Sequence, residues 1–208
     1  MSEIPNQPAR HGIGELHGVA FEVVAWDGAH ADAALSVACM FEREAAGATL
    51  QGGLLHLDQA LDGALTALRR SGGFRAEPME TLLITTPPAG IRAKTVMIIG
   101  LGVPESVTTE DLERAIRVTM REAIRLDASS VAFAPSLLDS GLVDGLSGDG
   151  ALAMLRGAFD ALAAEHRLAS LGLTTAAKIK RWSFDAGPTH IDSVGAEFSA
   201  AFARLTGS

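Results

Sequence analysis

The chain has 208 residues, the length of one domain, and 48% of them are hydrophobic, so it can bury a core. Its formal net charge of −8 gives no electrostatic reason to bind nucleic acid or an anionic membrane, and we expect neither as a partner. A single cysteine, Cys39, excludes an internal disulfide, and no segment has the apolar length of a signal peptide or a membrane span, so we expect a cytoplasmic protein.

The first part of the chain predicts two strands and one helix. Residues 1–17 are polar and broken by Pro and Gly, and we expect them to form a flexible leader before a single domain over residues 18–208. From Leu54 to Leu68, leucines recur at steps of three and four, which predicts one amphipathic helix. The predicted strands cover 18–26 and 33–41, and a charged loop is expected at 42–47.

Two apolar runs rich in β-branched residues, Thr81–Thr85 and Lys94–Leu101, flank a turn that contains Pro and Gly. Neither run alternates between apolar and polar residues, so we expect both to be buried strands at the centre of a sheet. The second run ends at Gly100-Leu101-Gly102, where glycine lets the backbone come close to another group.

The second part of the chain continues the alternation of helices and strands. Thr108 is a good N-cap for a helix. Two arginines of this helix, Arg114 and Arg117, follow glutamates by four residues, so we interpret the arginine face of the helix as ion-paired and solvated. The remaining predictions are a strand at 130–134, a loop rich in Ser, Gly and Asp, a helix at 150–166, strands at 168–175 and 178–185, and a helix at 191–205. This alternation predicts an α/β fold with a largely parallel sheet covered on both faces.

No conventional catalytic or metal-binding motif is present. The six histidines are scattered, with no HExxH, and there is no CxxC, no GxGxxG after a strand, no Walker loop and no GxSxG. The sequence therefore indicates no catalytic residue, no metal ligand and no cofactor.

Three loops remain as candidates for a binding site, because each lies where a predicted strand ends or a helix begins. Ligands of α/β sheets gather at the carboxyl ends of strands, and helix N-termini attract anions. Turns need the same residue types, so an ordinary structural role is the alternative. The candidate residues are Gly52 and Gly53, Gly100 and Gly102, and Ser136, Ser140 and Gly141.

Four consecutive segments carry a resemblance to a known family: DAALSVACMFE from Asp32, LDQALDGAL from Leu57, TPPAGIRAKTVMIIGLG from Thr86 and SVTTEDLERAIRVTMREA from Ser106. In this order they resemble the N-terminal domain of the leucyl aminopeptidase, or cytosol aminopeptidase, family. The resemblance covers residues 18–140. It implies a macrodomain-like fold, in which a mixed, mostly parallel sheet is the middle layer of a three-layer α/β/α arrangement.

The resemblance implies no peptidase residue in this chain. In the family, that chemistry lies in a separate C-terminal domain, which binds two metal ions through a lysine and several carboxylates and carries an Asn-Thr-Asp-Ala-Glu-Gly-Arg motif. We therefore expect a non-catalytic, stand-alone homologue that acts by forming a homo-oligomer or by regulating an aminopeptidase-like partner. The alternative is a split or degenerate aminopeptidase whose catalytic half is encoded separately.

The wider resemblance to macrodomains implies a second possible function, the binding of ADP-ribose or a related nucleotide. By that match Asp32 would face an adenine, while the glycines at 52–53 and Ser140 with Gly141 would face a diphosphate. Ser36 and Cys39 stand where ADP-ribose-binding macrodomains have asparagines, so ADP-ribosyl hydrolase chemistry is not implied.

Overall fold

The computed structural model describes residues 8–26, 29–45, 47, 49–135, 150–187 and 189–207. They form a seven-stranded sheet in the order β1-β2-β7-β6-β3-β5-β4. Neighbouring strands from β2 to β5 pair in parallel, and β1 and β4 pair antiparallel at the two edges, which confirms the predicted mixed, mostly parallel sheet. The strands are β1 (Arg10–Leu16), β2 (Val19–Val24), β3 (Leu35–Met40), β4 (Thr81–Ile84), β5 (Thr95–Gly100), β6 (Ser130–Ala134) and β7 (Arg181–Asp185).

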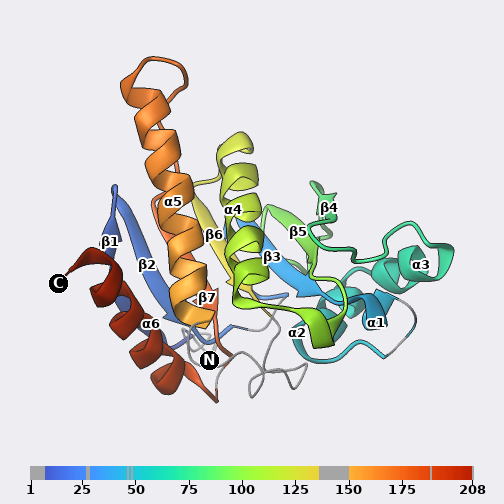
Figure 1. The fold of residues 1–208 in the computed structure, drawn as a ribbon. Helices are drawn as coiled ribbons and strands as arrows, with labels where there is room; N and C mark the ends of the chain where they lie inside the picture. Colours follow the sequence, from blue (N-terminus) through green and yellow to red (C-terminus); the bar gives the residue numbers. More distant parts are fainter. Residues whose placement is uncertain are drawn as a thin grey trace, which may run out of the picture.

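Helices lie on both faces of the sheet and complete the predicted three layers (Figure 1). One face carries α4 (Thr109–Arg125), α5 (Gly150–Ser170) and α6 (Ile191–Thr206). On the other face, α2 (Gly52–Ala60) and α3 (Ala64–Ser71) cover β3 and β5. The short elements are α1 (Glu42–Ala45) and a 3-10 turn at Pro104–Ser106. None of the described helices is both long and apolar enough to cross a membrane.

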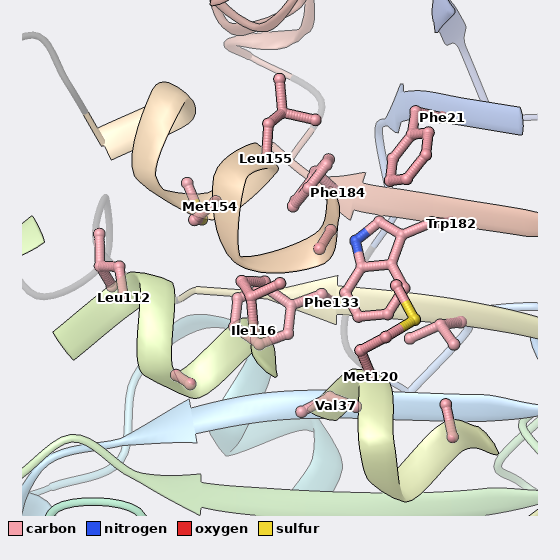
Figure 2. Close-up of a cluster of buried hydrophobic side chains, with 14 of the residues drawn as sticks. Phe21, Val37, Leu112, Ile116, Met120, Phe133, Met154, Leu155, Trp182 and Phe184 are labelled. Carbon is pink, nitrogen blue, oxygen red and sulfur yellow. The ribbon is translucent and has the colours of Figure 1, made fainter. Parts of the chain in front are cut away.

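The larger core fills the space between the sheet and the layer of α4, α5 and α6 (Figure 2). Trp182 of β7 is fully buried there, with its ring centroid 6.4 Å from that of Phe133 and 6.2 Å from that of Phe184. Met120 and Leu155 close over these rings from α4 and α5. Since a fully buried side chain of this size contributes about 1.5–3 kcal/mol, this layer fixes the helices on the sheet.

The edge strand β1 differs from the prediction. Residues 1–17 are predicted to be a loose leader, but Arg10–Leu16 pair with β2. The strand is also fixed to α6, because His11 Nε2 lies 3.1 Å from Ser199 Oγ, and a Cβ on Gly14 would come within 2.5 Å of the Phe202 ring. Gly14 therefore allows α6 to pack directly on this strand.

The predicted leucine-rich helix is interrupted. Helix α2 ends at Ala60 and α3 begins at Ala64, because Asp62 and Gly63 take φ values of +54° and +79°, outside the helical region. Asp58 holds the join, since its carboxylate accepts hydrogen bonds from Thr66 N at 3.1 Å and Thr66 Oγ1 at 2.6 Å. The preceding charged segment, predicted as a loop, includes the single turn α1.

Two predicted strands are also placed differently. Thr81–Ile84 is a strand, but it lies at the sheet edge and not at the centre. Residues 168–175 are not a strand, because α5 continues to Ser170. Gly172, with φ +71°, ends that helix in a Schellman arrangement, in which Leu173 N donates to Leu168 O at 3.0 Å.

Candidate functional site

Four of the five predicted site residues that the structure describes lie near the carboxyl ends of the parallel strands. In the register of the sheet, Met40 at the end of β3 pairs with Gly100 at the end of β5. Helix α2 begins with Gly52 and Gly53. Ser136, Ser140 and Gly141 lie outside the described residues.

The loop from Gly100 to Gly102 is already in contact with another segment of the chain. Gly100 N donates to Glu80 O at 2.8 Å, and Gly102 N donates to Ala76 O at 2.9 Å. A Cβ on Gly100 would lie 2.2 Å from Glu77 O, so no larger residue fits. These glycines allow the predicted close approach, but the group that approaches is backbone, and their N–H groups are not available to a phosphate.

The N-terminus of α2 keeps the properties of an anion site. Gly52 has φ +51°, and the N-cap residue Gln51 makes no side-chain hydrogen bond to the helix. The first N–H groups of any helix lack partners within that helix, and the helix dipole favours negative charge there. Of the described candidates, Gly52 and Gly53 are therefore the ones that still suit a phosphate.

Asp32 lies at the opposite ends of the strands, where the parallel strands begin. It is exposed and precedes β3, and its carbonyl oxygen accepts a hydrogen bond from Arg181 Nη2 at 2.9 Å, where β7 begins. The six residues of β3 separate it from the loops described above by about 20 Å. The structure therefore does not bring Asp32 together with the candidate glycines.

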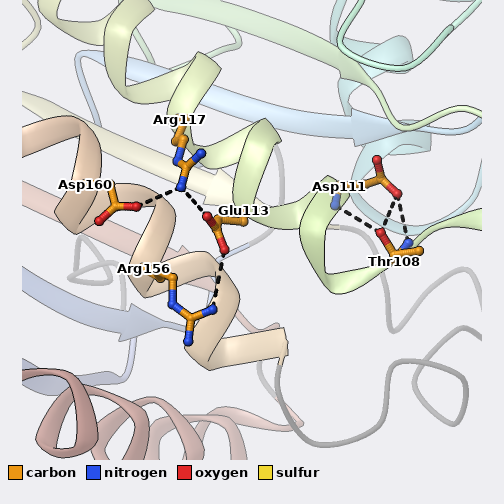
Figure 3. A network of polar contacts seen from close by, with 6 residues as sticks. All are labelled: Thr108, Asp111, Glu113, Arg117, Arg156 and Asp160. Carbon is orange, nitrogen blue, oxygen red and sulfur yellow. Dashed lines mark hydrogen bonds and ion pairs between the residues drawn. The ribbon is translucent and has the colours of Figure 1, made fainter.

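Ion pairs on the arginine face of α4 include the predicted pair of Arg117 with Glu113, whereas Arg114 lies 3.5 Å from Asp111. Some of these ion pairs reach α5 (Figure 3). Arg117 pairs with Glu113 and, at 2.7 Å, with Asp160 of α5. Arg156 of α5 lies 3.7 Å from the same Glu113. The helix begins in a capping box in which Thr108 and Asp111 each accept a hydrogen bond from the other's backbone N–H. This polar network joins two helices, and sequence reasoning missed its α5 members.

The most exposed apolar surface was also missed by the sequence analysis. Leu168, Leu171 and Leu173 are 39%, 53% and 71% exposed. They belong to residues 168–177, which contain no charged residue and which we call the α5 tip. Helix α5 carries this tip beyond the ends of the strands, clear of the rest of the domain (Figure 1). Part of this segment, residues 168–175, was wrongly predicted to be a strand.

A family model for the cytosol aminopeptidase family, N-terminal domain, matches residues 37–153, which is more than half of the chain. The chain belongs to this family. A probable cytosol aminopeptidase of Synechococcus elongatus is 34% identical over 109 residues, which are 50% of this chain and 21% of the relative. A probable cytosol aminopeptidase of Alkaliphilus oremlandii is 32% identical over 100 residues, 48% of this chain and 20% of the relative. This aminopeptidase N-terminal domain thus spans about a fifth of the length of the curated relatives it matches.

Solved structures show the same fold at low sequence identity. A tomato leucine aminopeptidase mutant superposes with a TM-score of 0.63 and 16% identity, over 96% of this chain and 38% of that one. An Oceanobacillus iheyensis macrodomain superposes with a TM-score of 0.62 and 13% identity, over 96% of this chain and 98% of that one. The aminopeptidase N-terminal domain therefore has the macrodomain-like fold that its resemblance implied.

Cys39 occupies the core of this aminopeptidase domain. It is fully buried in β3, and burial raises the pKa of its thiol, an effect that the carboxylate of Glu44 increases. Because the thiolate is the reactive form, we predict that the thiol reagent DTNB modifies no cysteine in native buffer and one per chain in guanidinium chloride. Modification of the folded protein at the rate seen in denaturant would contradict this burial.

Ser36, the other residue found where macrodomains have asparagines, is also buried in β3. Among the described residues, no group of three or more His, Cys, Asp or Glu side chains could hold a metal ion. The described structure thus offers three features to a ligand or partner: the N-terminus of α2, the α5 tip and a hollow that is described below.

Proposed function

We propose that this aminopeptidase N-terminal domain is non-catalytic and acts through protein association, with the α5 tip as the contact surface. The observation that carries the proposal is the position of the exposed leucines. Three of the four large hydrophobic side chains that are exposed in the described structure lie on this one projection. Clustered exposed apolar residues mark protein contacts, and an uncharged tip on an acidic chain reduces like-charge repulsion.

The partner in this proposal is an aminopeptidase-like protein or a second copy of the domain. The curated relatives are about five times as long as the matched region, so a domain of this kind works beside further aminopeptidase sequence in those proteins. Three leucines alone cover much less than the roughly 1,600 Å² of a standard interface. We therefore expect weak association through the tip unless neighbouring surfaces contribute.

The test replaces exposed leucines of the α5 tip by charged residues, which should leave the fold intact. A double variant, Leu171→Lys with Leu173→Lys, is expected to weaken association at least about tenfold, because two desolvated charges would enter the contact. Sedimentation velocity, with the domain alone and mixed with a purified cytosol aminopeptidase, measures the change. Val103→Lys is the matched control, since Val103 is 45% exposed and lies before the 3-10 turn, away from the tip.

Three results would contradict the proposal. The first is a wild-type domain that stays monomeric in both experiments, and the second is a Val103→Lys variant that loses association as fully as the double variant. The third concerns the non-catalytic part. Hydrolysis of leucine p-nitroanilide by the domain with added manganese or zinc, persisting after removal of contaminating peptidases, would show that it carries peptidase chemistry.

We propose nucleotide binding as a second function, favoured by the uncapped, glycine-rich N-terminus of α2. ADP-ribose at one hundred times its dissociation constant would add about 2.7 kcal/mol to the free energy of unfolding. A thermal-shift titration should then show the midpoint rising by about 5–10 °C. Gly53→Val is expected to abolish the rise, because a side chain there would block close approach of a phosphate. No rise with ADP-ribose or AMP would contradict this second function.

A further inference from the structure

A hollow lies at the amino ends of the parallel strands, at the opposite end of the sheet from the predicted site. Its volume is about 260 Å³. Its floor is the start of β3, at Ala34 and Leu35, and its two walls are the start of β5 and the segment that leads from α4 into β6. Because β5 and β6 are the two neighbours of β3, the walls stand two strand spacings apart, about 10 Å. We call this feature the amino-edge hollow.

One wall of the amino-edge hollow is cationic. Lys94, exposed at the start of β5, lines it, and within the described part of the chain no carboxylate lies within ion-pair distance of this lysine. The chain has only three lysines, and the other two, Lys178 and Lys180, also precede a parallel strand at this edge. All three lysines of this acidic protein therefore lie at the end of the sheet that holds the hollow.

The facing wall is anionic. Asp127 lines it, directly after the C-terminal end of α4, where the helix dipole is negative. Lys178 Nζ lies 2.7 Å from Asp127 Oδ2, but both side chains are more than half exposed, so this pair is weak enough to admit a second cation. Arg125 adds no free positive charge, because it is hydrogen-bonded to Glu122 and thereby lowers the pKa of that carboxyl.

We propose that the amino-edge hollow binds a free α-amino acid with a short apolar side chain. Its carboxylate would pair with Lys94, its ammonium group with Asp127, and its side chain would lie over Leu126, which is only partly buried. A ligand with both charges suits walls of opposite sign better than a simple anion or cation does. The hollow is also smaller than the roughly 300–1,000 Å³ pockets that hold larger ligands, so it fits one residue and not a peptide.

Calorimetric titration with L-leucine tests the site, with the α-keto acid of leucine as the analogue that lacks the ammonium group. Lys94→Gln should raise the dissociation constant for both compounds about tenfold or more, since it removes a charge-assisted hydrogen bond. Asp127→Asn should weaken leucine binding alone. Asparagine tolerates the left-handed backbone at this position, where φ is +53°, so this variant is expected to fold.

Lys180→Gln is the matched control, because Lys180 lies at the same edge but does not line the hollow. It should bind leucine like the wild type. No binding of leucine at millimolar concentration would overturn the proposal, as would equal losses in the Lys94→Gln and Lys180→Gln variants. These variants leave the α5 tip intact, so failure here and failure of the proposed association are separate results.

Discussion

Replacing Trp182 by alanine is expected to lower the free energy of unfolding by about 3–5 kcal/mol. The indole is fully buried on β7 and packs against the rings of Phe133 and Phe184 (Figure 2). Its removal would leave a cavity between β7 and the helices, and the rigid neighbouring strands cannot collapse to fill it. Urea unfolding measures this loss. It is followed by circular dichroism, because the substitution removes one of the two tryptophans on which a fluorescence signal would depend.

Trp182→Phe separates cavity formation from loss of the indole N–H. In the described structure, Trp182 Nε1 is buried and has no hydrogen-bond partner. Phenylalanine removes that unsatisfied donor, which offsets part of the lost apolar contact, so the expected cost is below about 2 kcal/mol. Equal costs for the alanine and phenylalanine variants would contradict the packing described for this core.

Gly157→Ala is expected to destabilise the domain by about 2–3 kcal/mol, within the usual range for overpacking. A Cβ on Gly157 of α5 would lie 2.4 Å from the backbone oxygen of Glu113 on α4, and backbone cannot turn aside as a side chain can. The two helices would have to separate, which would also strain the ion pair between Arg117 and Asp160. The measurement is the urea midpoint, with the slope checked for two-state behaviour.

Gly150→Ala is the control for this prediction, because it makes the same change in the same helix. Among the described residues, its Cβ would meet only Leu112 Cδ1, at 3.8 Å, which is an ordinary contact. Alanine favours a helix over glycine by about 1 kcal/mol, so stability should stay unchanged or rise slightly. If both alanine variants were equally stable, the close contact of α4 with α5 would not be a constraint.

The sequence was most informative where a local pattern and the core agree. The strand that ends at Gly100 was predicted to within one residue at each end, and the start of the helix capped by Thr108 was predicted correctly, because β-branched residues and N-cap residues are local signals. The fold class followed from the alternation of such elements. The family resemblance then supplied the layered architecture, which the structural superpositions match.

The errors arose where distant contacts decide the conformation. The strand β1 is glycine-rich, and its packing against α6 explains one of these glycines, Gly14, which lies beside Phe202. Residues 168–175 were predicted as a strand, but Leu168 lies in the last turn of α5, and Leu171 and Leu173 lie in the exposed segment that follows it. No local rule distinguishes these two cases.

The candidate site was only partly predictable for the same reason. Gly100 and Gly52 look alike in the sequence, since both are glycines near element ends. The first is packed against the backbone of Glu77, and the second begins a helix without a side-chain cap. The amino-edge hollow was not foreseen, because Lys94 and Asp127 belong to segments that meet only through their shared neighbour β3.

Hydrogen–deuterium exchange of the wild-type domain, alone at low and high concentration and mixed with a purified cytosol aminopeptidase, tests the central claim most directly. Association through the α5 tip predicts slower exchange at residues 168–177 when the partner or a second copy is present, with β3 and β5 unchanged. Slower exchange confined to other surfaces, or no change under any of these conditions, would contradict the claim that this domain acts through that contact.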